Sequence, residues 1–207
     1  MTPHPSIHLF DLDGTLVKGN SSFHFFLYLL RKGILPWSSF FRAAALFFAF
    51  KRQWISLPQF HREVFRVFLK GKKKALFVDA VEPFLDLWLE KSLDRLLLAQ
   101  AAGEKILLSS SPDFLVGPIA QRLHIKRWEA SQYAVDHEGV FSEIVNIVDG
   151  AEKLRWADRL AHASRITAYS DSDEDLPLLL WAGKVYVVRP NRRLRKIAET
   201  KGWQEVK

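Results

Sequence analysis

Ser6-Ile7-His8-Leu9-Phe10 is followed directly by Asp11-Leu12-Asp13-Gly14-Thr15. The mostly apolar first half predicts a short buried strand, and the acids and glycine of the second half predict the turn that ends it. Because the chain turns at Gly14, the carboxylates of Asp11 and Asp13 can both project toward one site. An ordinary surface turn has the same residue types, so this stretch indicates a function only if polar residues from other parts of the chain lie close to it.

Strands and helices alternate along the chain outside residues 17–78. Further strands are predicted at 105–108, 165–169 and 185–188, and helices at 84–101, at 151–161 and from 191 onward. Alternation around Glu138-Gly139 predicts a hairpin within 133–148. This order is typical of an α/β fold with a parallel sheet and helices on both faces.

Polar clusters follow three of the predicted strands, namely Asp11 with Asp13, Ser109, and Asp171 with Asp175. In parallel sheets of this kind, ligands bind beyond the carboxyl ends of the strands. We therefore expect these clusters, which are far apart in the sequence, to converge on one crevice. Ser111 is also expected to cap a helix whose first residue is Pro112.

The residue types in these clusters suit phosphate chemistry. Mg²⁺ is a hard ion that uses few carboxylates and keeps several waters, so it suits an oxygen-rich pocket without cysteine. Lys153 and the Ser109 hydroxyl can hold the charge of a phosphate, and a carboxylate can act as a covalent nucleophile. Taken singly, each residue has a structural interpretation: Lys153 as a solvated lysine, and residues 173–175 as acids at a helix start.

Composition limits the alternatives. The 207 residues suffice for one domain, or for a domain with a small insertion. With 48% hydrophobic and 26% charged residues, the chain does not belong to the disordered or low-complexity classes. The absence of cysteine excludes disulfide frameworks, thiolate metal sites and cysteine nucleophiles. Residues 1–8 lack a basic-then-apolar signal pattern, so we expect a cytoplasmic protein.

Positive charge is concentrated in one segment. Residues 17–78 contain twelve Lys or Arg and a single acid, Glu63, and so carry +11, whereas the rest of the chain carries −4. This asymmetry indicates an anionic partner for the segment: a membrane surface, a nucleic acid or a charged substrate. A solvated basic face without a partner is the alternative.

The same segment is also rich in phenylalanine. Eight of the sixteen phenylalanines lie between Phe23 and Phe50. The 17 residues from Ile34 to Phe50 include Pro36 and Arg42, and they are short for a transmembrane helix, which needs about 20 apolar residues. A buried helix, a re-entrant pair or an interfacial helix lying on lipid fits this stretch better.

Four motifs together resemble those of the haloacid dehalogenase (HAD) superfamily. They are Phe10-Asp11-Leu12-Asp13-Gly14-Thr15-Leu16, Leu108-Ser109-Ser110-Ser111-Pro112, Lys153, and Ser170-Asp171-Ser172-Asp173-Glu174-Asp175-Leu176-Pro177. The second and fourth motifs are similar to subfamily IB, the phosphoserine-phosphatase-like branch. The resemblance implies a Rossmann-like core formed by residues 1–16 and 79–207, with the basic, Phe-rich segment 17–78 inserted as a helical cap.

The resemblance also implies roles for individual residues. Asp11 would be the nucleophile, and Asp13 would protonate the leaving oxygen and then activate water. Mg²⁺ would be held by Asp11, Asp171 and the backbone carbonyl of Asp13. The other implied roles are phosphate binding by Ser109 and Lys153, and positioning of Lys153 or a metal-bound water by Asp175.

The residues that set the substrate depart from the phosphoserine phosphatase pattern. Asn20 stands where those enzymes usually have a glutamate, and Glu174 stands in place of an asparagine. Arg62 and Arg66 are only near the position of their cap arginine. The long, apolar and basic cap resembles that of bacterial phosphatidylglycerophosphatases in this branch, and a lipid phosphate would use both its apolar and its basic side chains.

We therefore predict a Mg²⁺-dependent phosphomonoester hydrolase that acts through an aspartyl-phosphate intermediate. Its predicted substrate is a lipid-linked phosphate such as phosphatidylglycerophosphate, met at the inner face of the membrane through the cap. A soluble, phosphoserine-like phosphatase of small metabolites is the alternative. A non-catalytic membrane- or RNA-binding protein on this fold is a third hypothesis, which the intact Asp11 and Asp13 count against. No nucleic-acid partner is expected, because the phenylalanines precede most of the lysines instead of alternating with them.

Overall fold

The computed structural model describes residues 6–206, and the outer ends of the predicted core segments, residues 1–5 and 207, lie outside the described residues. Its sheet has seven strands in the order β4-β3-β2-β1-β5-β6-β7. All neighbours are parallel except β3 and β4. The strands are β1 (Ile7–Phe10), β2 (Glu104–Pro112), β3 (Arg127–Val135), β4 (Phe141–Asn146), β5 (Ile166–Ser170), β6 (Lys184–Val188) and β7 (Gln204–Val206). The predicted α/β class with a parallel Rossmann-like sheet is confirmed.

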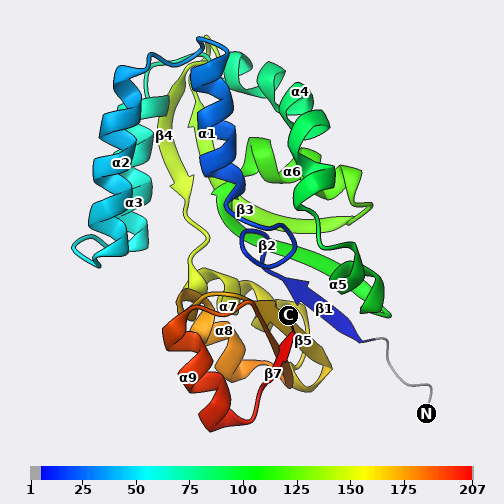
Figure 1. Ribbon diagram of the computed structural model, residues 1–207. Helices are drawn as coiled ribbons and strands as arrows, with labels where there is room; N and C mark the ends of the chain where they lie inside the picture. Colours follow the sequence, from blue (N-terminus) through cyan, green and yellow to red (C-terminus); the bar gives the residue numbers. More distant parts are fainter. Residues whose placement is uncertain (1–5, 207) are drawn as a thin grey trace.

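Helices cover both faces of this sheet (Figure 1). Alternate residues of β1 point into two separate cores: Phe10 packs with α4 and α6, and Leu9 packs with α7, α8 and α9. The helices are α1 (Ser21–Arg31), α2 (Ser38–Lys51), α3 (Leu57–Val64), α4 (Ala75–Ser92), α5 (Arg95–Gln100), α6 (Asp113–Arg122), α7 (Gly150–Leu160), α8 (Leu176–Trp181) and α9 (Arg192–Lys201). Shorter helical turns are η1 (Phe65–Leu69), η2 (Ala163–Arg165) and η3 (Asp173–Asp175).

The single helix predicted at 84–101 is wrong, because two helices meet there. Helix α4 begins at Ala75 and ends at Ser92, and α5 begins after Asp94, whose side chain accepts a hydrogen bond from the N–H of Leu97. The backbone N–H of Asp94 donates to the carbonyl of Leu16. A tertiary contact with the loop after β1 therefore ends the helical run, although Asp94 lies within an apolar helical pattern.

Residues 17–78, the predicted cap, contain α1, α2, α3 and η1 and the first residues of α4, so the predicted boundary at residue 78 falls inside a helix. Hydrogen bonds join residues 71–74 to the β3–β4 hairpin, including Gly71 N–H to the Phe141 carbonyl and Lys74 N–H to the Gly139 carbonyl.

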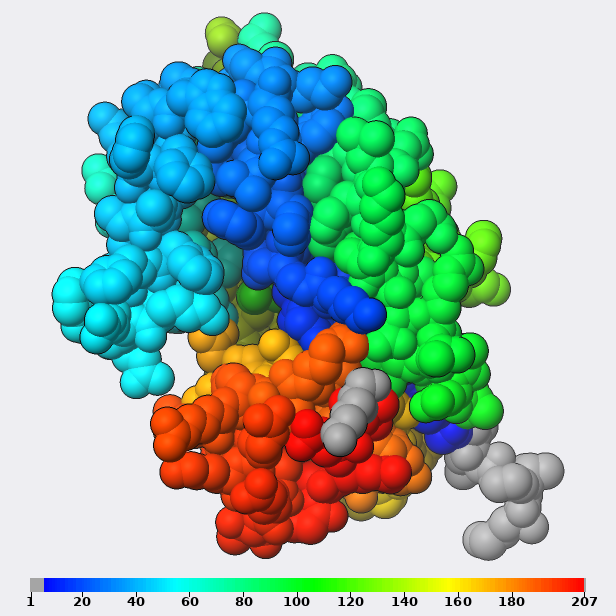
Figure 2. Space-filling model, viewed as in Figure 1, coloured from blue at the N-terminus to red at the C-terminus, as the bar shows by residue number. Residues whose placement is uncertain are grey.

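Figure 2 shows the surface hollowed between the cyan segment that contains α2 and α3 and the yellow-to-orange segment that contains α7 and α8. The division into core and cap stays a prediction.

Helix α2 is too short to cross a bilayer, at 14 residues. Within residues 6–206, no helix combines the length and the hydropathy that a membrane span requires.

The start of α7 lies directly against the loop that follows β5. A Cβ added at Gly150 would lie 1.9 Å from the carbonyl oxygen of Glu174. The side chain of Asp149 accepts a hydrogen bond from the N–H of Glu152 and caps the helix at this point. Glycine at position 150 therefore allows the first turn of α7 to approach the β5 loop.

We predict that Gly150→Ala lowers the free energy of unfolding by about 2 kcal/mol, because the new methyl group overlaps backbone that cannot move away. Without that overlap, alanine would be neutral or favourable in the first turn of a helix. Gly139→Ala is the matched control: its φ is +75° and no atom lies within 4 Å of the added Cβ, so it costs only backbone strain of about 1 kcal/mol. Urea unfolding followed by tryptophan fluorescence measures both, and a Gly150→Ala protein as stable as the native one would contradict the packing described.

Candidate active site

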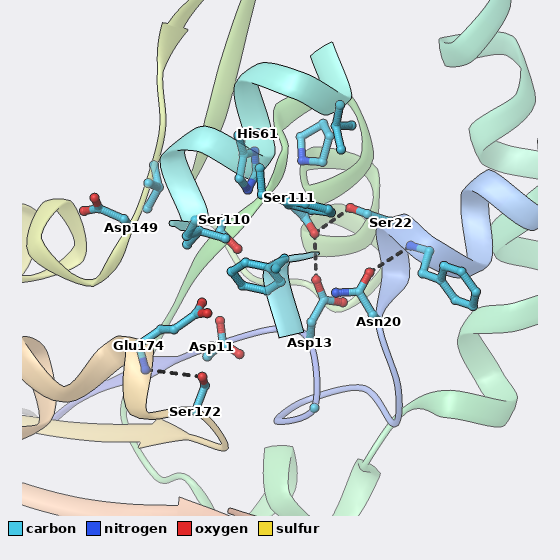
Figure 3. A pocket seen from close by; sticks show the side chains of 18 of the residues that line it. Asp11, Asp13, Asn20, Ser22, His61, Ser110, Ser111, Asp149, Ser172 and Glu174 are labelled. Atoms are coloured by element: carbon cyan, nitrogen blue, oxygen red, sulfur yellow. Dashed lines mark hydrogen bonds between the residues drawn. The ribbon is translucent and has the colours of Figure 1, made fainter. Parts of the chain in front are cut away.

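The carboxyl ends of β2, β1 and β5 lie side by side at one edge of the sheet. Asp11 follows β1, Ser111 lies near the end of β2, and Asp171 follows β5. All three line a cavity of about 710 Å³, together with Asp13, Lys153 and Asp175. The predicted convergence is therefore observed for Asp11, Asp13, Asp171 and Asp175, whereas Ser110 and Ser111 line the cavity in place of the predicted Ser109. Figure 3 shows Asp11, Asp13, Ser110 and Ser111 around the cavity.

Lys153 is the central buried charge of this site. It lies in the first turn of α7 and is only 3% exposed. Its Nζ donates to Asp11 Oδ1 at 2.7 Å and contacts Asp175 Oδ1 at 2.8 Å. Burial would lower the pKa of Lys153, but the two carboxylates raise it well above its usual value. Lys153 is thus held as a cation against Asp11.

Asp175 belongs to the same network from the opposite side. Its side chain is almost fully buried, and Oδ2 accepts a hydrogen bond from the Ser170 hydroxyl at 2.8 Å. Because Ser170 is the last residue of β5, this bond fixes Asp175 relative to the sheet. Asp175 in turn orients the ammonium group of Lys153.

Asp13 is surrounded by hydrogen-bond donors. Its Oδ2 accepts from the Ser111 hydroxyl at 2.6 Å, and its Oδ1 accepts from the backbone N–H of Ser21 at 2.5 Å. Burial raises the pKa of Asp13, while the Ser111 and Ser21 hydrogen bonds limit the rise. A carboxyl group with a raised pKa keeps its proton to a higher pH than a free aspartic acid, which favours a role as a general acid.

The serines at the end of β2 do not behave as predicted from the sequence. Helix α6 begins at Asp113 with Pro112 as its N-cap, so Ser111 does not cap it. Ser109 is buried and its hydroxyl accepts from the Ser111 N–H at 3.1 Å, whereas Ser110 and Ser111 line the cavity. Ser109 is not among the cavity-lining residues, so its role as a phosphate ligand stays a prediction.

Asp171 lies against the backbone of the loop after β1. A Cβ at Gly14, where φ is +81°, would be 2.1 Å from Asp171 Oδ2. The absence of a side chain at Gly14 therefore allows Asp171 to approach the Asp11–Asp13 loop. Burial and the neighbouring Asp175 raise the pKa of Asp171 to about 7.

Arg189 binds the same loop, and its role was not predicted from the sequence. Its guanidinium donates to the carbonyls of Gly14 and Thr15 and pairs with Asp94 at 2.8 Å. Arg189 follows β6 and has a φ of +45°. No local sequence pattern signals this residue, because its partners are backbone carbonyls far away in the sequence.

Asp11, Asp13, Asp171 and Asp175 all line the cavity. Among the described residues, Lys153 is the cation that pairs directly with any of them, namely with Asp11 and Asp175. Burial raises the pKa values of Asp11 and Asp171, and repulsion from the neighbouring carboxylates raises them further. Among residues 6–206 no group of three or more His, Asp or Glu side chains is arranged to hold a metal ion by itself. The ligand set implied by the resemblance needs only two carboxylates, Asp11 and Asp171, plus the backbone carbonyl of Asp13. This oxygen donor set, with its uncompensated negative charge, fits Mg²⁺.

The far end of the cavity is apolar. It is lined by phenylalanines of residues 17–78, namely Phe23, Phe26, Phe47, Phe50, Phe60 and Phe68. Arg62 and Arg66 are not among the lining residues, and Arg66 pairs with Glu63 on the surface. Asn20 and Glu174 do line the cavity, and Asn20 also accepts from the Phe23 N–H as the N-cap of α1. The cavity therefore joins a carboxylate-rich end to a phenylalanine-rich end.

Comparison with known proteins places the chain in a family. Residues 8–180 match the haloacid dehalogenase-like hydrolase family. The chain belongs to this family. It is an enzyme of the phosphatase type, as predicted from the four motifs. The resemblance stated above is therefore confirmed at the level of the family.

Individual relatives are distant in sequence. The phosphoserine phosphatase SerB1 of Mycobacterium tuberculosis is 27% identical over 212 residues, which cover 94% of this chain and 68% of the relative. A protein of unknown function from Bordetella pertussis has the same fold, with a TM-score of 0.85, 21% identity and 99% of each chain covered. A structure titled as a phospho-aspartyl intermediate analogue of phosphoserine phosphatase has a TM-score of 0.63 and 14% identity, with 93% of this chain and 90% of that chain covered.

We predict that Asp171→Asn stabilises the metal-free protein at about pH 8. The folded pKa of Asp171 is about 7, above its usual value of 3.8, so its contribution to stability is complete below about pH 4 and is lost as the pH rises through 7. The Asn side chain carries no charge, so Asp171→Asn avoids this loss of stability at about pH 8. Near pH 4, where Asp171 is protonated, the two proteins should be equally stable. Added Mg²⁺ should reverse the order, because only the native protein keeps the carboxylate.

Thermal unfolding in EDTA and in Mg²⁺, at both pH values, measures this effect. Asp79→Asn is the control, since Asp79 is exposed on α4, away from the cavity. An Asp171→Asn protein that is less stable than the native protein in EDTA at about pH 8 would contradict the crowding of carboxylates described above.

Proposed function

We propose that this phosphatase hydrolyses phosphomonoesters through a phosphorylated Asp11. The observation that carries the proposal is the arrangement of two partly buried carboxyl groups on one loop: Asp11 is held by Lys153, and Asp13 has a raised pKa. Oδ1 of Asp11 accepts from Lys153, while Oδ2 has a 3.5 Å contact with the Thr15 hydroxyl, at the limit for a hydrogen bond. That second oxygen is the candidate nucleophile.

The proposed reaction has two steps. An oxygen of Asp11 forms a bond to phosphorus as the bond from phosphorus to the alcohol oxygen breaks, and Asp13 gives its proton to that oxygen. Asp13 then takes a proton from water, whose oxygen attacks the phosphorus and releases inorganic phosphate from Asp11. Lys153 lies where it can neutralise charge on the phosphoryl group. The relative titled as a phospho-aspartyl intermediate analogue supports this chemistry.

Mg²⁺ is part of the proposal. Asp11, Asp171 and the backbone carbonyl of Asp13 would hold it. When bound, the ion supplies positive charge to the phosphoryl oxygens and offsets the repulsion between the carboxylates.

The shape of the cavity supports a substrate with a phosphate at one end and an apolar group at the other. A lipid-linked phosphate, such as phosphatidylglycerophosphate, has this form. Recognition of free phosphoserine has less support, because Arg62 and Arg66 lie outside the cavity and Asn20 cannot balance an amino group by charge. A small-metabolite phosphatase remains the second candidate, and the name of the relative SerB1 favours it.

The outer face of α2 supports contact with an anionic membrane. Trp37, Phe41 and Phe48 recur at helical spacing and are 62%, 76% and 50% exposed, and Trp54 beside Phe48 is 70% exposed. Exposed basic residues flank this face, namely Arg31, Lys32, Arg42, Lys51 and Arg52. Aromatic side chains with flanking cations are typical of a helix lying at a lipid interface.

The opposite face of α2 lines the cavity through Ala43, Phe47 and Phe50. One helix therefore separates the proposed membrane surface from the proposed substrate site. We propose that the protein acts on its substrate at the inner face of the membrane, with α2 against the lipid.

We predict that Asp11→Asn lowers kcat by roughly four orders of magnitude or more, because the amide cannot act as the nucleophile. Asp13→Asn should lower kcat on alkyl phosphates by about 10²–10⁴-fold. With an aryl phosphate, whose leaving group needs no proton, the Asp13→Asn enzyme should instead accumulate phosphoenzyme, detectable after acid quench with ³²P-labelled substrate. Asp173→Asn is the control, since this acid of the same motif lies outside the cavity lining. Normal turnover by a folded Asp11→Asn enzyme would exclude the mechanism.

We predict that Ala43→Trp selectively impairs long-chain substrates. Ala43 lines the apolar end of the cavity, so the indole should exclude an alkyl chain and lower kcat/KM for a long-chain alkyl phosphate by about 100-fold. Hydrolysis of p-nitrophenyl phosphate should be unaffected. Ala44→Trp is the matched control, because the neighbouring Ala44 is exposed and is not part of the lining. Equal losses on both substrates would favour the small-metabolite phosphatase.

We predict that the native protein binds anionic liposomes, and that the triple substitution of Trp37, Phe41 and Phe48 by serine weakens this binding at least about tenfold. Serine substitution of three exposed leucines outside α2 is the control, namely Leu87, Leu96 and Leu180. Co-sedimentation with vesicles that contain phosphatidylglycerol, and with neutral phosphatidylcholine vesicles, measures the effect. If native protein stays in the supernatant at low salt, or if the aromatic face instead forms a dimer in solution, the membrane proposal is wrong.

A further inference from the structure

A pair of polar rings lines the cavity in addition to the groups used above. His61 lies on α3 and is 9% exposed, and its Nδ1 is 3.1 Å from the hydroxyl of Tyr133 on β3. Both side chains line the cavity, as do Ser110 and Asp149. Figure 3 shows His61 on the cap side of the cavity, with Asp11 and Asp13 on the opposite side.

The positions of both rings are fixed by aromatic neighbours. Phe65 stacks on Tyr133 with ring centroids 5.7 Å apart, and Phe60 contacts His61 edge-on at 6.2 Å. Tyr133 also packs against Phe114 and Phe141 in the main core. The pair is therefore a rigid feature of the cavity wall, which is what a recognition site requires.

Neither ring carries charge at neutral pH. Burial lowers the pKa of His61 to about 4, although Asp149 opposes the change, and burial raises the pKa of Tyr133 above its usual value. A neutral imidazole cannot balance the charge of a phosphate or a carboxylate. It can only exchange a hydrogen bond with a ligand.

The unassigned atom is Nε2 of His61. Within residues 6–206 it has no hydrogen-bond partner, whereas Nδ1 is committed to Tyr133. If the Tyr133 hydroxyl donates to Nδ1, then Nε2 carries a hydrogen and must donate; if Nδ1 donates, then Nε2 must accept. A hydroxyl group satisfies Nε2 in both cases because it both donates and accepts.

We propose that His61, oriented by Tyr133, recognises a hydroxyl group on the alcohol part of the substrate, between the phosphate ester and the apolar portion. The inference rests on the proposed function, whose substrate is amphiphilic, and adds a hydroxyl group to the description of that substrate. The preferred substrates are then monophosphates of polyols that carry an apolar substituent. Simple alkyl phosphates lack the group that Nε2 binds. His61 is thus a specificity-determining residue and takes no part in the bond-breaking steps.

Two substrates that differ by one hydroxyl test the proposal: 1-acylglycerol 3-phosphate and its 2-deoxy analogue, with p-nitrophenyl phosphate as a reference. The native enzyme should favour the hydroxylated substrate in kcat/KM by about tenfold, which is the value of one net hydrogen bond. His61→Phe should bring this ratio close to one by lowering only the rate with the hydroxylated substrate. His61→Asn should restore part of the preference, since its amide can donate and accept.

His24→Phe is the matched control, because His24 lies on α1 of the same cap segment and does not line the cavity. It should leave the ratio unchanged. If His61→Phe fails to fold, Tyr133→Phe provides the second variant: it keeps Nε2 but removes the partner that orients the imidazole, and it should reduce the ratio about threefold.

The possible results separate this inference from the proposed function. Equal losses on both acyl substrates in His61→Phe would show a structural role for His61 and overturn the inference. A native enzyme that favours acyl substrates over p-nitrophenyl phosphate but ignores the hydroxyl would also overturn the inference and leave the proposed function intact. A native enzyme that does not favour either acyl substrate would contradict the proposed function itself.

Discussion

The ion cluster formed by Lys153, Asp11 and Asp175 is the interaction on which the rest of the site depends. Burying a lysine is favourable only when carboxylates surround it, and removing one partner of such a pair typically costs about 3–5 kcal/mol. The cluster therefore links the end of β1, the start of α7 and the turn after β5, which are distant in the sequence. The close approach of Gly150 to the Glu174 carbonyl has the same consequence, since it brings α7 within reach of Asp11.

The loop that carries the two catalytic candidates is fixed by α1 and by the residues around the sheet. The N–H of Ser21, the first residue of α1, donates to Asp13, and the Ser22 hydroxyl bonds to that of Ser111 at 2.7 Å. From the core side, Arg189 binds the carbonyls of Gly14 and Thr15. The position and the protonation of Asp13 therefore depend on where α1 packs.

What could be predicted from the sequence was local or repeated along the chain. The strand before Asp11, the hairpin around Gly139 and the convergence of the motifs follow from apolar patterns and from the geometry of parallel sheets. The helix break at Asp94 could not be predicted because it depends on a bond to Leu16. Arg189 and His61 were missed for the same reason, since each is defined by partners in distant elements. The role predicted for Ser111 was wrong: it was expected to cap the helix that follows, but its hydroxyl donates to Asp13.

Helix α2 differs from its neighbours in how little of it is buried. Ser39 is its only buried residue, whereas α1 places Phe25, Leu29 and Leu30 in the main core. Residues 71–74, beyond α3, are tied to the β3–β4 hairpin by backbone hydrogen bonds. A segment with few buried contacts opens at a low free-energy cost compared with the rest of the fold. Amide hydrogen exchange should therefore be fastest, among the helices of residues 17–78, along α2 and the turns that flank it, so the wall that Ala43, Phe47 and Phe50 form is the least stable part of the cavity.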